Sequence, residues 1–369
     1  MRIIHATNSA QKSSLGIEKE ATNLAVAQKT RGSDVMMAID SQGVFTATCR
    51  KHGISVMVQA GLGQPPGESD AVARESAVQD FIECIESFNP DIIHCHSTGA
   101  AVVAIAAGNR VNIPCVVTND ATRAVIEGKK RGLHFAVICI TTASFEELKK
   151  EAAHTGVFYI SNGTRAMPLT PARQTKVGHS TDLVFVGSLI SEKGVDVAIM
   201  AMVELQRRLG QDCPVLNIYG DGPERKYLTE MAAVLELNHI VQFHGFKAGI
   251  LERCPSTDIL VLPSRDERCP LVVLEAMSCG MPIVASDVGD VSEMLPDRRY
   301  GRVIPSDSII ALADAIESFR ADIGGGRFNP DLVIERHRSL YSIEKWAERV
   351  ETAYNQILLD SSVPVQGAR

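Results

Sequence analysis

The strongest constraint on the fold is an alternation of short β-branched runs with longer amphipathic stretches, which continues along the whole chain. This alternation is typical of repeated β-α-β units around a parallel sheet. In the first half the expected strands are Ile3 to Ala6, Val35 to Ile39, Ile54 to Val58, Ile92 to Cys95, Cys115 to Thr118, Phe135 to Ile140 and Val157 to Ile160. In the second half they are Leu183 to Val186, Val215 to Tyr219, Ile240 to Phe243, Ile259 to Leu262, Ile283 to Ala285 and Arg302 to Ile304.

The two sets of strands predict two domains. Residues 164–181 separate them and hold two prolines and few apolar residues, which is typical of an interdomain linker. A chain of 369 residues and 39.9 kDa also exceeds what one core usually serves. We therefore expect an α/β protein with two Rossmann-like, doubly wound parallel sheets over residues 1–165 and 182–340, joined by a linker over 166–181. Residues 341–360 are expected to form a last amphipathic helix.

Composition and charge exclude several classes of protein. The net charge of −7 and the pI of about 5.8 argue against a nucleic-acid partner, whose binding site is normally basic. The N-terminus is too polar for a signal peptide, and the most apolar window, Ala100 to Gly108, is too short to span a membrane. Nine cysteines never approach a CxxC spacing and are expected to be reduced thiols. We expect a cytoplasmic protein.

The first half of the chain is the more basic one. Residues 1–176 hold 18 Lys and Arg against 16 Asp and Glu, whereas the remainder holds 19 against 28. The basic residues of Gly128 to Arg131, with Lys149, Lys150 and Arg165, could attract an anionic lipid surface or a phosphorylated acceptor. The other interpretation is ordinary solvated charge, because a net charge of +2 over this length is small.

Common cofactor motifs are missing from the sequence. Gly61 to Gly67 and Gly220 to Arg225 do not have the spacing of a dinucleotide-binding loop, and there is no GxxxxGK[ST] phosphate loop. For His94-Cys95-His96 we expect the two imidazoles to point to opposite faces of the strand, which would keep them from sharing one zinc ion. We therefore expect neither a metal nor a cofactor.

The region from Leu262 to Gly289 is the most informative. A buried strand ends in a polar loop, Pro270 sits where a first helical turn would begin, and Gly280 supplies a left-handed end to the helix. The backbone N–H groups of Cys269 to Val272 would lie at a helix N-terminus, where a diphosphate is stabilised. Glu267 in the loop and Glu275 in the helix are eight residues apart. The pattern indicates a binding site for a sugar nucleotide.

At this point the sequence resembles a family, the retaining glycosyltransferases of the large family 4, which have the GT-B fold. The segment carrying Glu267 and Glu275, followed by AMSCGMPIVASDVGDVSE, looks like the family signature. Shorter pieces occur in the family's order: Leu15-Gly16-Ile17-Glu18, PDIIHCH at 90–96, Ser161-Asn162-Gly163, Val186 to Leu189 with Glu192-Lys193-Gly194, Tyr219 to Pro223 and Phe243 to Phe246. The resemblance implies two Rossmann-like domains facing a cleft, with the last helix packing back on the first domain.

The resemblance also implies roles for single residues. Glu275 would hold the ribose hydroxyls of the nucleotide, Glu267 would face the transferred sugar, and Lys193 would neutralise the leaving diphosphate. Gly16 would let the backbone approach the phosphate from the first domain. The remaining donor-binding residues that it implies are Gly187, Ser188, Gly245, Phe246, Cys269, Pro270, Leu271 and Val272. The other interpretation of Lys193, Glu267 and Glu275 is an ordinary solvated charge, and that of Gly16 is a turn.

The chain departs from the family pattern at three places. Ser188 stands where the family usually has an arginine, and we expect Arg265 or Arg268 to substitute for that cation. Asn119-Asp120 stands where the family commonly has a histidine that contacts the donor sugar, so Asp120 is carried over as a catalytic candidate, with a helix cap as its other interpretation. The usual Gly-Gly pair before Glu18 is reduced to Leu15-Gly16.

The resemblance implies a metal-independent, retaining glycosyltransferase, and we expect it to act in bacterial cell-surface polysaccharide or lipopolysaccharide synthesis. Its partners would be a nucleotide sugar and a glycan or lipid-linked acceptor, with possible peripheral contact at the inner membrane and no nucleic acid. The absence of any DxD sequence fits metal independence. Two alternatives stay open: a GT-B enzyme that is no transferase, such as a sugar-nucleotide epimerase, and a catalytically weak subunit that binds nucleotide sugar.

Overall fold

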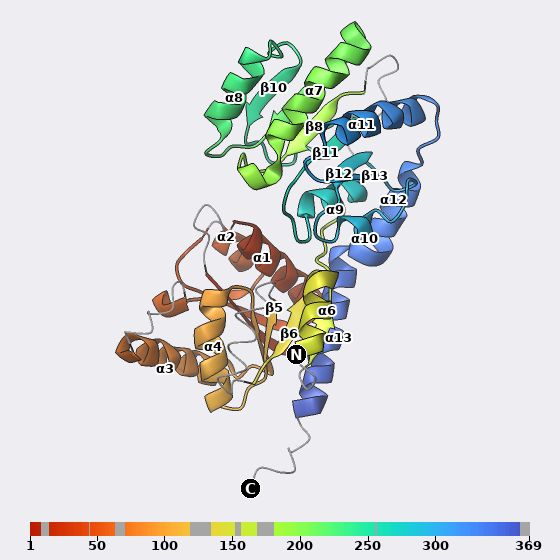
Figure 1. The fold of residues 1–369 in the computed structure, drawn as a ribbon. Coiled ribbons are helices and arrows are strands. Elements are labelled where there is room, and N and C mark those ends of the chain that lie inside the picture. The colour runs from red at the N-terminus through yellow and green to blue at the C-terminus, as the bar shows by residue number, and fades with distance from the viewer. Residues whose placement is uncertain are drawn as a thin grey trace. The chain divides into compact units, whose positions relative to one another are not determined.

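The chain folds into two compact units. The computed structural model describes residues 1–8, 15–43, 45–62, 71–118, 134–151, 156–167, 181–254 and 257–361. Unit 1 comprises Met1–Asn162 together with Ile343–Arg369, and unit 2 comprises Gly163–Ser342. The chain therefore enters unit 2 after Asn162 and returns to unit 1 at Ile343 (Figure 1).

Unit 1 is built on a seven-stranded parallel sheet with the strand order β3-β2-β1-β4-β5-β6-β7. All seven expected strands are present: β1 Arg2–Thr7, β2 Asp34–Ile39, β3 Ser55–Val58, β4 Ile92–Cys95, β5 Cys115–Thr118, β6 Ala136–Cys139 and β7 Val157–Tyr159. The helical elements between them are α1 Leu15–Thr30, α2 Thr46–Lys51, η1 Ala60–Leu62, α3 Ala71–Phe88, α4 Thr98–Arg110 and α6 Thr142–Glu151. The strand order reverses between β1 and β4.

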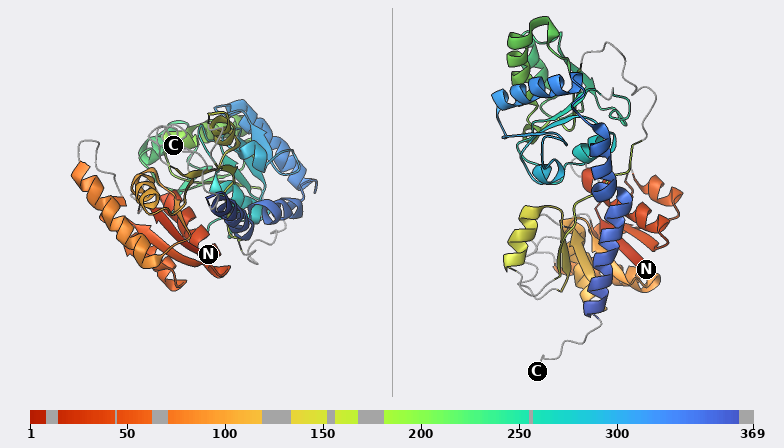
Figure 2. Two further views of the ribbon diagram at one scale, coloured as in Figure 1. Left: turned by 90° about the horizontal axis from the view of Figure 1, so that it is seen from below. Right: turned by 90° about the vertical axis from the view of Figure 1, so that its right-hand side faces the viewer.

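Helices cover both faces of this sheet, as the doubly wound pattern requires. On one face, Ile4 and Ile93 pack with Phe81 of α3 and Val103 of α4. On the other face, Ile3 and Ile92 pack with α1 and with the last helix, α13 Ile343–Ser361. The apolar residues of α13 in this core are Ile343, Trp346, Ala347, Val350, Ala353, Tyr354 and Ile357. Figure 2 shows α13 running alongside the sheet of unit 1.

Unit 2 repeats the architecture with a six-stranded parallel sheet in the order β10-β9-β8-β11-β12-β13. Its strands are β8 Leu183–Val186, β9 Leu216–Tyr219, β10 Val241–Gly245, β11 Ile259–Leu262, β12 Ile283–Ser286 and β13 Arg302–Ile304, which match the six expected ones. Its helical elements are η3 Ser191–Lys193, α7 Val195–Leu209, η4 Gly210–Asp212, α8 Arg225–Val234, α9 Leu271–Ser278, α10 Val291–Met294, α11 Ile309–Gly324, α12 Pro330–Arg336 and η5 His337–Tyr341. Here the order reverses between β8 and β11.

The segment expected to be a linker begins inside unit 2. The backbone N–H of Met167 donates a hydrogen bond to Ser278 Oγ at 3.2 Å, which fastens the segment to α9. Residues 168–180 lie outside the described residues. No helix among the described residues is long and apolar enough to cross a membrane.

A cluster of three buried histidines lies in unit 1 between the sheet, α1 and α13. His5 of β1 and His94 of β4 are register partners, and His96 follows β4 directly. His94 and His96 have ring centroids only 4.1 Å apart. The expectation that these two rings point to opposite faces is therefore wrong, because residues two apart on a strand share a face.

Hydrogen bonds tie the cluster to the surrounding elements. His94 Nδ1 lies 2.5 Å from Tyr354 Oη of α13, and His94 Nε2 lies 2.6 Å from Thr118 Oγ1 at the end of β5. Burial lowers the pKa of His5 to about 4 and holds the pKa values of His94 and His96 well below 6.5. All three rings are therefore neutral at neutral pH.

We predict that unit 1 is destabilised by mild acid. The pKa of such a histidine is 6.5 in the unfolded chain and lower in the folded state, so below pH 6.5 the unfolded state binds the proton more readily. Each of these histidines should therefore lower the free energy of unfolding by up to about 1.4 kcal/mol per pH unit below 6.5, down to its folded-state pKa. Denaturation at several pH values, followed by the fluorescence of Trp346 in α13, measures this slope. His5→Gln should reduce the slope and His239→Gln, at an exposed position of unit 2, should not; an equal slope in both variants would contradict the assignment.

Candidate active site

The candidate site of unit 2 lies where the strand order reverses. The loops that leave the carboxyl ends of β8 and β11 carry Gly187, Ser188 and Lys193 on one side and Glu267 on the other. Open parallel sheets bind their ligands at this position, because the loops from two neighbouring strands diverge there and leave a crevice. The sequence places the charged residues of the motif in these two loops.

Lys193 and Glu267 form an ion pair although 74 residues separate them in the chain. Lys193 Nζ lies 2.6 Å from Glu267 Oε1, and Ser264 Oγ donates to the same oxygen at 2.9 Å. The Glu267 side chain is only 8% exposed, whereas that of Lys193 is 25% exposed. The structure thus brings two of the predicted site residues together and leaves the cation accessible to a further anion.

Close backbone packing joins the two loops that carry this pair. Gly194 has a φ of +63°, and a Cβ atom there would lie 2.1 Å from the carbonyl oxygen of Pro263. The backbone N–H of Arg265 donates to the carbonyl of Glu192 at 2.8 Å. Only glycine permits both the left-handed conformation and this distance, so Gly194 fixes the position of Lys193 relative to Glu267.

Arg265 does not replace the missing arginine of position 188. Its guanidinium makes two bonds to Asp196, at 2.9 and 2.7 Å, one to Asp307 at 2.7 Å and one to the carbonyl of Ser191 at 2.6 Å. These carboxylates raise the pKa of Arg265. The side chain therefore supports the loop instead of offering its charge to a phosphate. Ser188 and Arg268 are both exposed.

Helix α9 brings a second group of predicted residues to the site. It begins at Leu271 with Pro270 as its N-cap, one residue later than expected, and the Pro270 side chain makes no capping hydrogen bond. Pro270 has no N–H and Val273 N–H already donates to the Pro270 carbonyl at 3.0 Å, so the helix offers the N–H groups of Leu271 and Val272. Glu275 is half-buried and lies one turn after Leu271 on the same side of the helix.

The remaining predicted residues are Gly187 and Ser188 in the turn after β8, Gly245 at the end of β10, and Phe246 directly after it. The turn after β9 contacts both segments. A Cβ atom at Gly220 would lie 1.8 Å from the carbonyl oxygen of Gly187, so the first two turns touch backbone to backbone. Gly220 N–H donates to the carbonyl of Gly245 at 3.0 Å, and Gly245 has a φ of +70°. Beyond it the side chain of Phe246 is 81% exposed, which leaves an aromatic face open to solvent.

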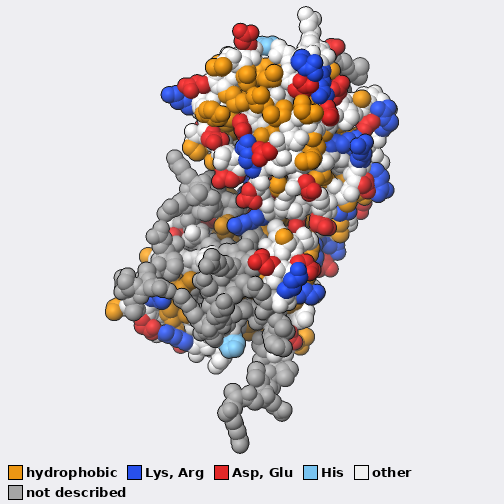
Figure 3. Space-filling model, viewed as in Figure 1, with side chains coloured by type: hydrophobic (Ala, Val, Ile, Leu, Met, Phe, Trp, Pro, Cys, Tyr) orange, Lys and Arg blue, Asp and Glu red, His pale blue; other side chains and the backbone are white. Residues whose placement is uncertain are grey.

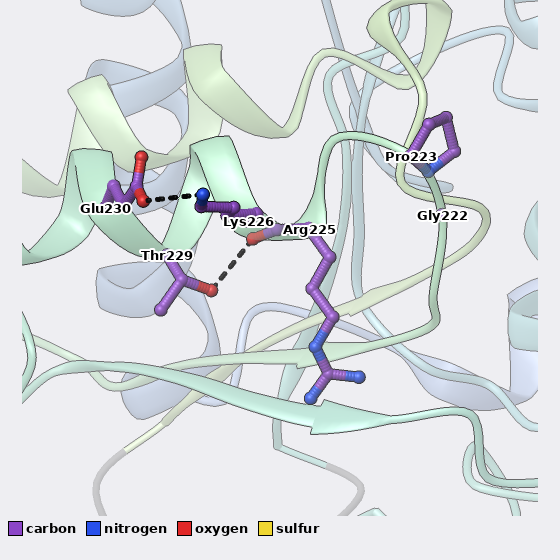
Figure 4. A pocket seen from close by; sticks show the side chains of 6 residues that line it. All are labelled: Gly222, Pro223, Arg225, Lys226, Thr229 and Glu230. Atoms are coloured by element: carbon purple, nitrogen blue, oxygen red, sulfur yellow. Dashed lines mark hydrogen bonds and ion pairs between the residues drawn. The ribbon is translucent and has the colours of Figure 1, made fainter.

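The exposed turn after β9 also borders an open hollow of about 550 Å³ (Figure 4). Its lining residues are Gly222, Pro223, Arg225, Lys226, Thr229 and Glu230. Lys226 pairs with Glu230 along α8, and Arg225 extends away from them. The hollow includes neither Lys193 nor Glu267, so the charged pair and the helix N-terminus define the candidate site.

The predicted residues of unit 1 are less constrained. Gly16 lies in the first turn of α1, exposed, and no atom lies within 4 Å of the position of a Cβ atom there. Asp120 lies outside the described residues. The structural feature of unit 1 that sequence reasoning missed is the histidine cluster, and the signal was present: His94 and His96 have the spacing of two residues on one face of a strand.

Two doubly wound parallel sheets in one chain are the architecture of the GT-B fold. Residues 169–323 match the family described as glycosyl transferases group 1, and residues 16–147 match a glycosyl transferase 4-like domain. The chain belongs to the group 1 glycosyltransferases.

Several known proteins are similar to this chain in sequence or in fold. It is 32% identical over 202 residues to an alpha-D-kanosaminyltransferase of Streptomyces kanamyceticus, covering 51% of each chain. It is 29% identical over 258 residues to a glycogen synthase of Mycobacterium tuberculosis, covering 64% of this chain and 61% of that one. The chain thus spans between half and two thirds of the length of these curated relatives. The crystal structure of HepE from Anabaena in complex with UDP and glucose superposes with a TM-score of 0.78 at 19% identity, covering 96% of this chain and 99% of that one.

We predict that Gly194→Ala destabilises unit 2 more than Gly249→Ala does. Both glycines have a left-handed φ, +63° and +64°, but a Cβ atom at Gly249 meets nothing closer than 3.7 Å. Gly249→Ala should therefore lower the free energy of unfolding by only about 1 kcal/mol, the cost of a left-handed backbone at alanine. Gly194→Ala should lower it by about 1–3 kcal/mol more, because two backbone segments must separate. The unfolding free energies of the two variants measure the difference; equal losses would contradict it.

Proposed function

We propose that this chain is a metal-independent glycosyltransferase that transfers a sugar from a nucleoside diphosphate donor with retention of anomeric configuration. The observation that carries the proposal is the pair of Lys193 and Glu267, 2.6 Å apart at the switch point of unit 2. The N–H groups at the start of α9 support it, since they favour a diphosphate without a metal ion. Glu275 supports it as well, because a carboxylate on this helix can accept hydrogen bonds from two ribose hydroxyls.

The chemistry assigned to these residues is front-face displacement. The bond between the anomeric carbon and the diphosphate oxygen breaks, and the acceptor oxygen forms the new bond to the same face of that carbon. The departing diphosphate carries the negative charge, which the Lys193 ammonium and the α9 N–H groups stabilise, and its own oxygen takes the acceptor proton. Glu267 releases Lys193 to the diphosphate and faces the positive charge that develops at the sugar.

For the donor we propose a uridine diphosphate sugar. The support is that solved structures with this fold include complexes of HepE with UDP and with UDP-glucose. The exposed ring of Phe246 beside Gly245 would border the base. Ser188 supplies no charge to the diphosphate, and the Arg265 guanidinium is bound by Asp196 and Asp307. Lys193 therefore provides a larger share of the positive charge that stabilises the diphosphate than it would beside an arginine at position 188.

For the acceptor we propose a glycan or a lipid-linked glycan of cell-surface polysaccharide synthesis. One relative of this chain is a putative teichuronic acid biosynthesis glycosyltransferase of Bacillus subtilis, and one structural neighbour is a lipopolysaccharide outer core galactosyltransferase. A peripheral membrane contact remains part of the proposal. Residues 128–131 lie outside the described residues, and in Figure 3 basic and acidic side chains are interspersed on the face in view.

The donor is tested by a thermal-shift panel of nucleoside diphosphates and their sugars. A ligand at about 100 times its Kd stabilises the folded state by about 2.7 kcal/mol, which is enough to identify the base. The proposal expects UDP and UDP-sugars to raise the Tm without added divalent metal, in buffer containing a chelator. No shift with any nucleotide, or shifts that require the metal, would contradict it.

Lys193→Ala should lower kcat by about 10²- to 10³-fold, as expected for the loss of one preorganised stabiliser of a leaving group. The control is Lys226→Ala, at an exposed lysine of α8, which should leave turnover unchanged. Steady-state transfer or hydrolysis of the identified donor measures the effect, and the Tm checks folding. Unchanged turnover in Lys193→Ala would exclude the leaving-group role.

Glu275→Ala should raise the donor KM more than it lowers kcat, because a group that binds the ribose acts equally on substrate and transition state. The loss of a hydrogen-bonded charge predicts an increase in KM of about 10- to 100-fold. The control is Glu230→Ala on α8, at an exposed glutamate outside the candidate site. A collapse of kcat at unchanged KM would contradict ribose binding.

A further inference from the structure

The histidine cluster of unit 1 contains a continuous chain of hydrogen bonds that begins at Gln28 of α1. Gln28 Oε1 lies 2.7 Å from His5 Nε2, and His5 Nδ1 lies 2.8 Å from His96 Nε2. Gln28 and His5 are fully buried, and His96 is 7% exposed. Water therefore does not compete for these bonds, and each must be satisfied within the chain.

The chain of bonds has one direction. The Gln28 amide is oriented with Oε1 toward His5 Nε2. Because that oxygen only accepts, this orientation requires His5 to carry its proton on Nε2, which leaves His5 Nδ1 as an acceptor. His96 must then donate from Nε2 to His5, so its own proton is on Nε2 and its Nδ1 holds a lone pair. Burial keeps the pKa values of both rings below 6.5, so neither ring gains a second proton at neutral pH that would break this order.

The last residue of this series of hydrogen bonds, His96, lies at the switch point of unit 1, where the strand order reverses. His96 follows β4 and its backbone N–H donates to the carbonyl of Ala6 in β1 at 2.9 Å, so it sits at the carboxyl ends of the two strands where the order reverses. This is the position at which a doubly wound sheet binds its ligand. No hydrogen bond to His96 Nδ1 is found among the described residues.

A second acceptor lies beside it. Asn8 follows β1, and its backbone N–H donates to Ser97 Oγ at 3.1 Å, next to His96 in the chain. The Asn8 side-chain oxygen Oδ1 is buried and, within the part of the chain that the structure describes, has no hydrogen-bond partner. Two acceptors without donors at one edge of the sheet fit a ligand that supplies donors, and hydroxyl groups supply them without a charge.

We propose that His96 is a binding residue for a carbohydrate hydroxyl, which it accepts at Nδ1, and that Gln28 and His5 are positioning residues that fix its tautomer. The proposal rests on the proposed function for the identity of the ligand as a sugar. The hydroxyl belongs either to the acceptor or to the sugar of the donor, because both have the same chemistry.

The same three rings do not form a metal site in this arrangement. The candidate ligand atoms lie within 4.8 Å of one another, but both nitrogens of His5 and both of His94 already take part in short hydrogen bonds.

The tautomer is tested by ¹⁵N NMR of the full chain labelled at histidine, without any ligand. Unprotonated ring nitrogens resonate far from protonated ones, and His5→Gln and His96→Gln assign the signals. The proposal expects His96 to be protonated at Nε2 and unprotonated at Nδ1 at pH 7.5. Gln28→Leu, which removes the acceptor at the start of the chain, should produce a mixture of His96 tautomers. A wild-type His96 protonated at Nδ1 would overturn the proposal, whatever the enzyme transfers.

Binding is tested with a matched pair of substitutions. The amide of His96→Gln can occupy the position of Nε2 and keep the bond to His5, but it removes Nδ1, whereas that of His96→Asn retains an acceptor near Nδ1. His52→Gln, at a histidine of unit 1 outside the cluster, is the control. His96→Gln should raise KM about three- to tenfold, as expected for one neutral hydrogen bond, His96→Asn should raise it less, and His52→Gln should not change it.

The two sources of the hydroxyl are separated by the substrate used. A higher KM for UDP-glucose in hydrolysis without acceptor assigns the hydroxyl to the donor sugar, and a higher KM only for the glycan acceptor in transfer assigns it to the acceptor. Wild-type KM values in folded His96→Gln for both substrates would overturn the binding role. A wild-type chain that uses no nucleotide sugar would instead refute the proposed function, and the NMR result would still stand or fall by itself.

Discussion

The ion pair between Lys193 and Glu267 is the interaction on which the candidate site of unit 2 depends. A carboxylate as buried as that of Glu267 needs a partner, because an unpaired charge removed from water costs several kcal/mol. Lys193 supplies that partner only because the turn at Gly194 packs directly against the carbonyl of Pro263. A backbone contact thus determines the position of the Lys193 ammonium relative to Glu267.

The two units use the same fold to make different electrostatic environments. In unit 2 the switch point holds full charges and helix N–H groups, which suit an anion. In unit 1 the switch point holds neutral imidazoles and an amide oxygen, kept neutral by burial, which suit an uncharged, hydroxyl-rich group. The division is consistent with a diphosphate held on one unit and a carbohydrate hydroxyl on the other.

The strands and helices of this protein could be predicted from its sequence, whereas several side-chain partners could not. All thirteen strands were predicted, since buried parallel strands are short β-branched runs with clear ends. The helix after Pro270 and its glycine end were also predicted, with the start one residue early. Arg265 or Arg268 was expected to replace the missing cation of position 188, yet Arg265 binds Asp196 and Asp307, which lie far from it in the sequence. His94 and His96 share a face of β4, as the two-residue period of a strand predicts, contrary to the expectation of opposite faces.

The amino-acid sequence by itself determined the elements: two sets of parallel strands, the helix that follows Glu267, and the motif that makes this chain a group 1 glycosyltransferase. These follow from local patterns, because periodicity and turn residues act over a few neighbouring positions. Only the tertiary structure decided the partners: which carboxylate holds Lys193, which groups occupy Arg265, and that His5, Gln28 and Tyr354 surround the histidines of β4. Such pairings join residues from 23 to 260 positions apart, and no local pattern specifies them, because they arise when the sheets bring distant strand ends together.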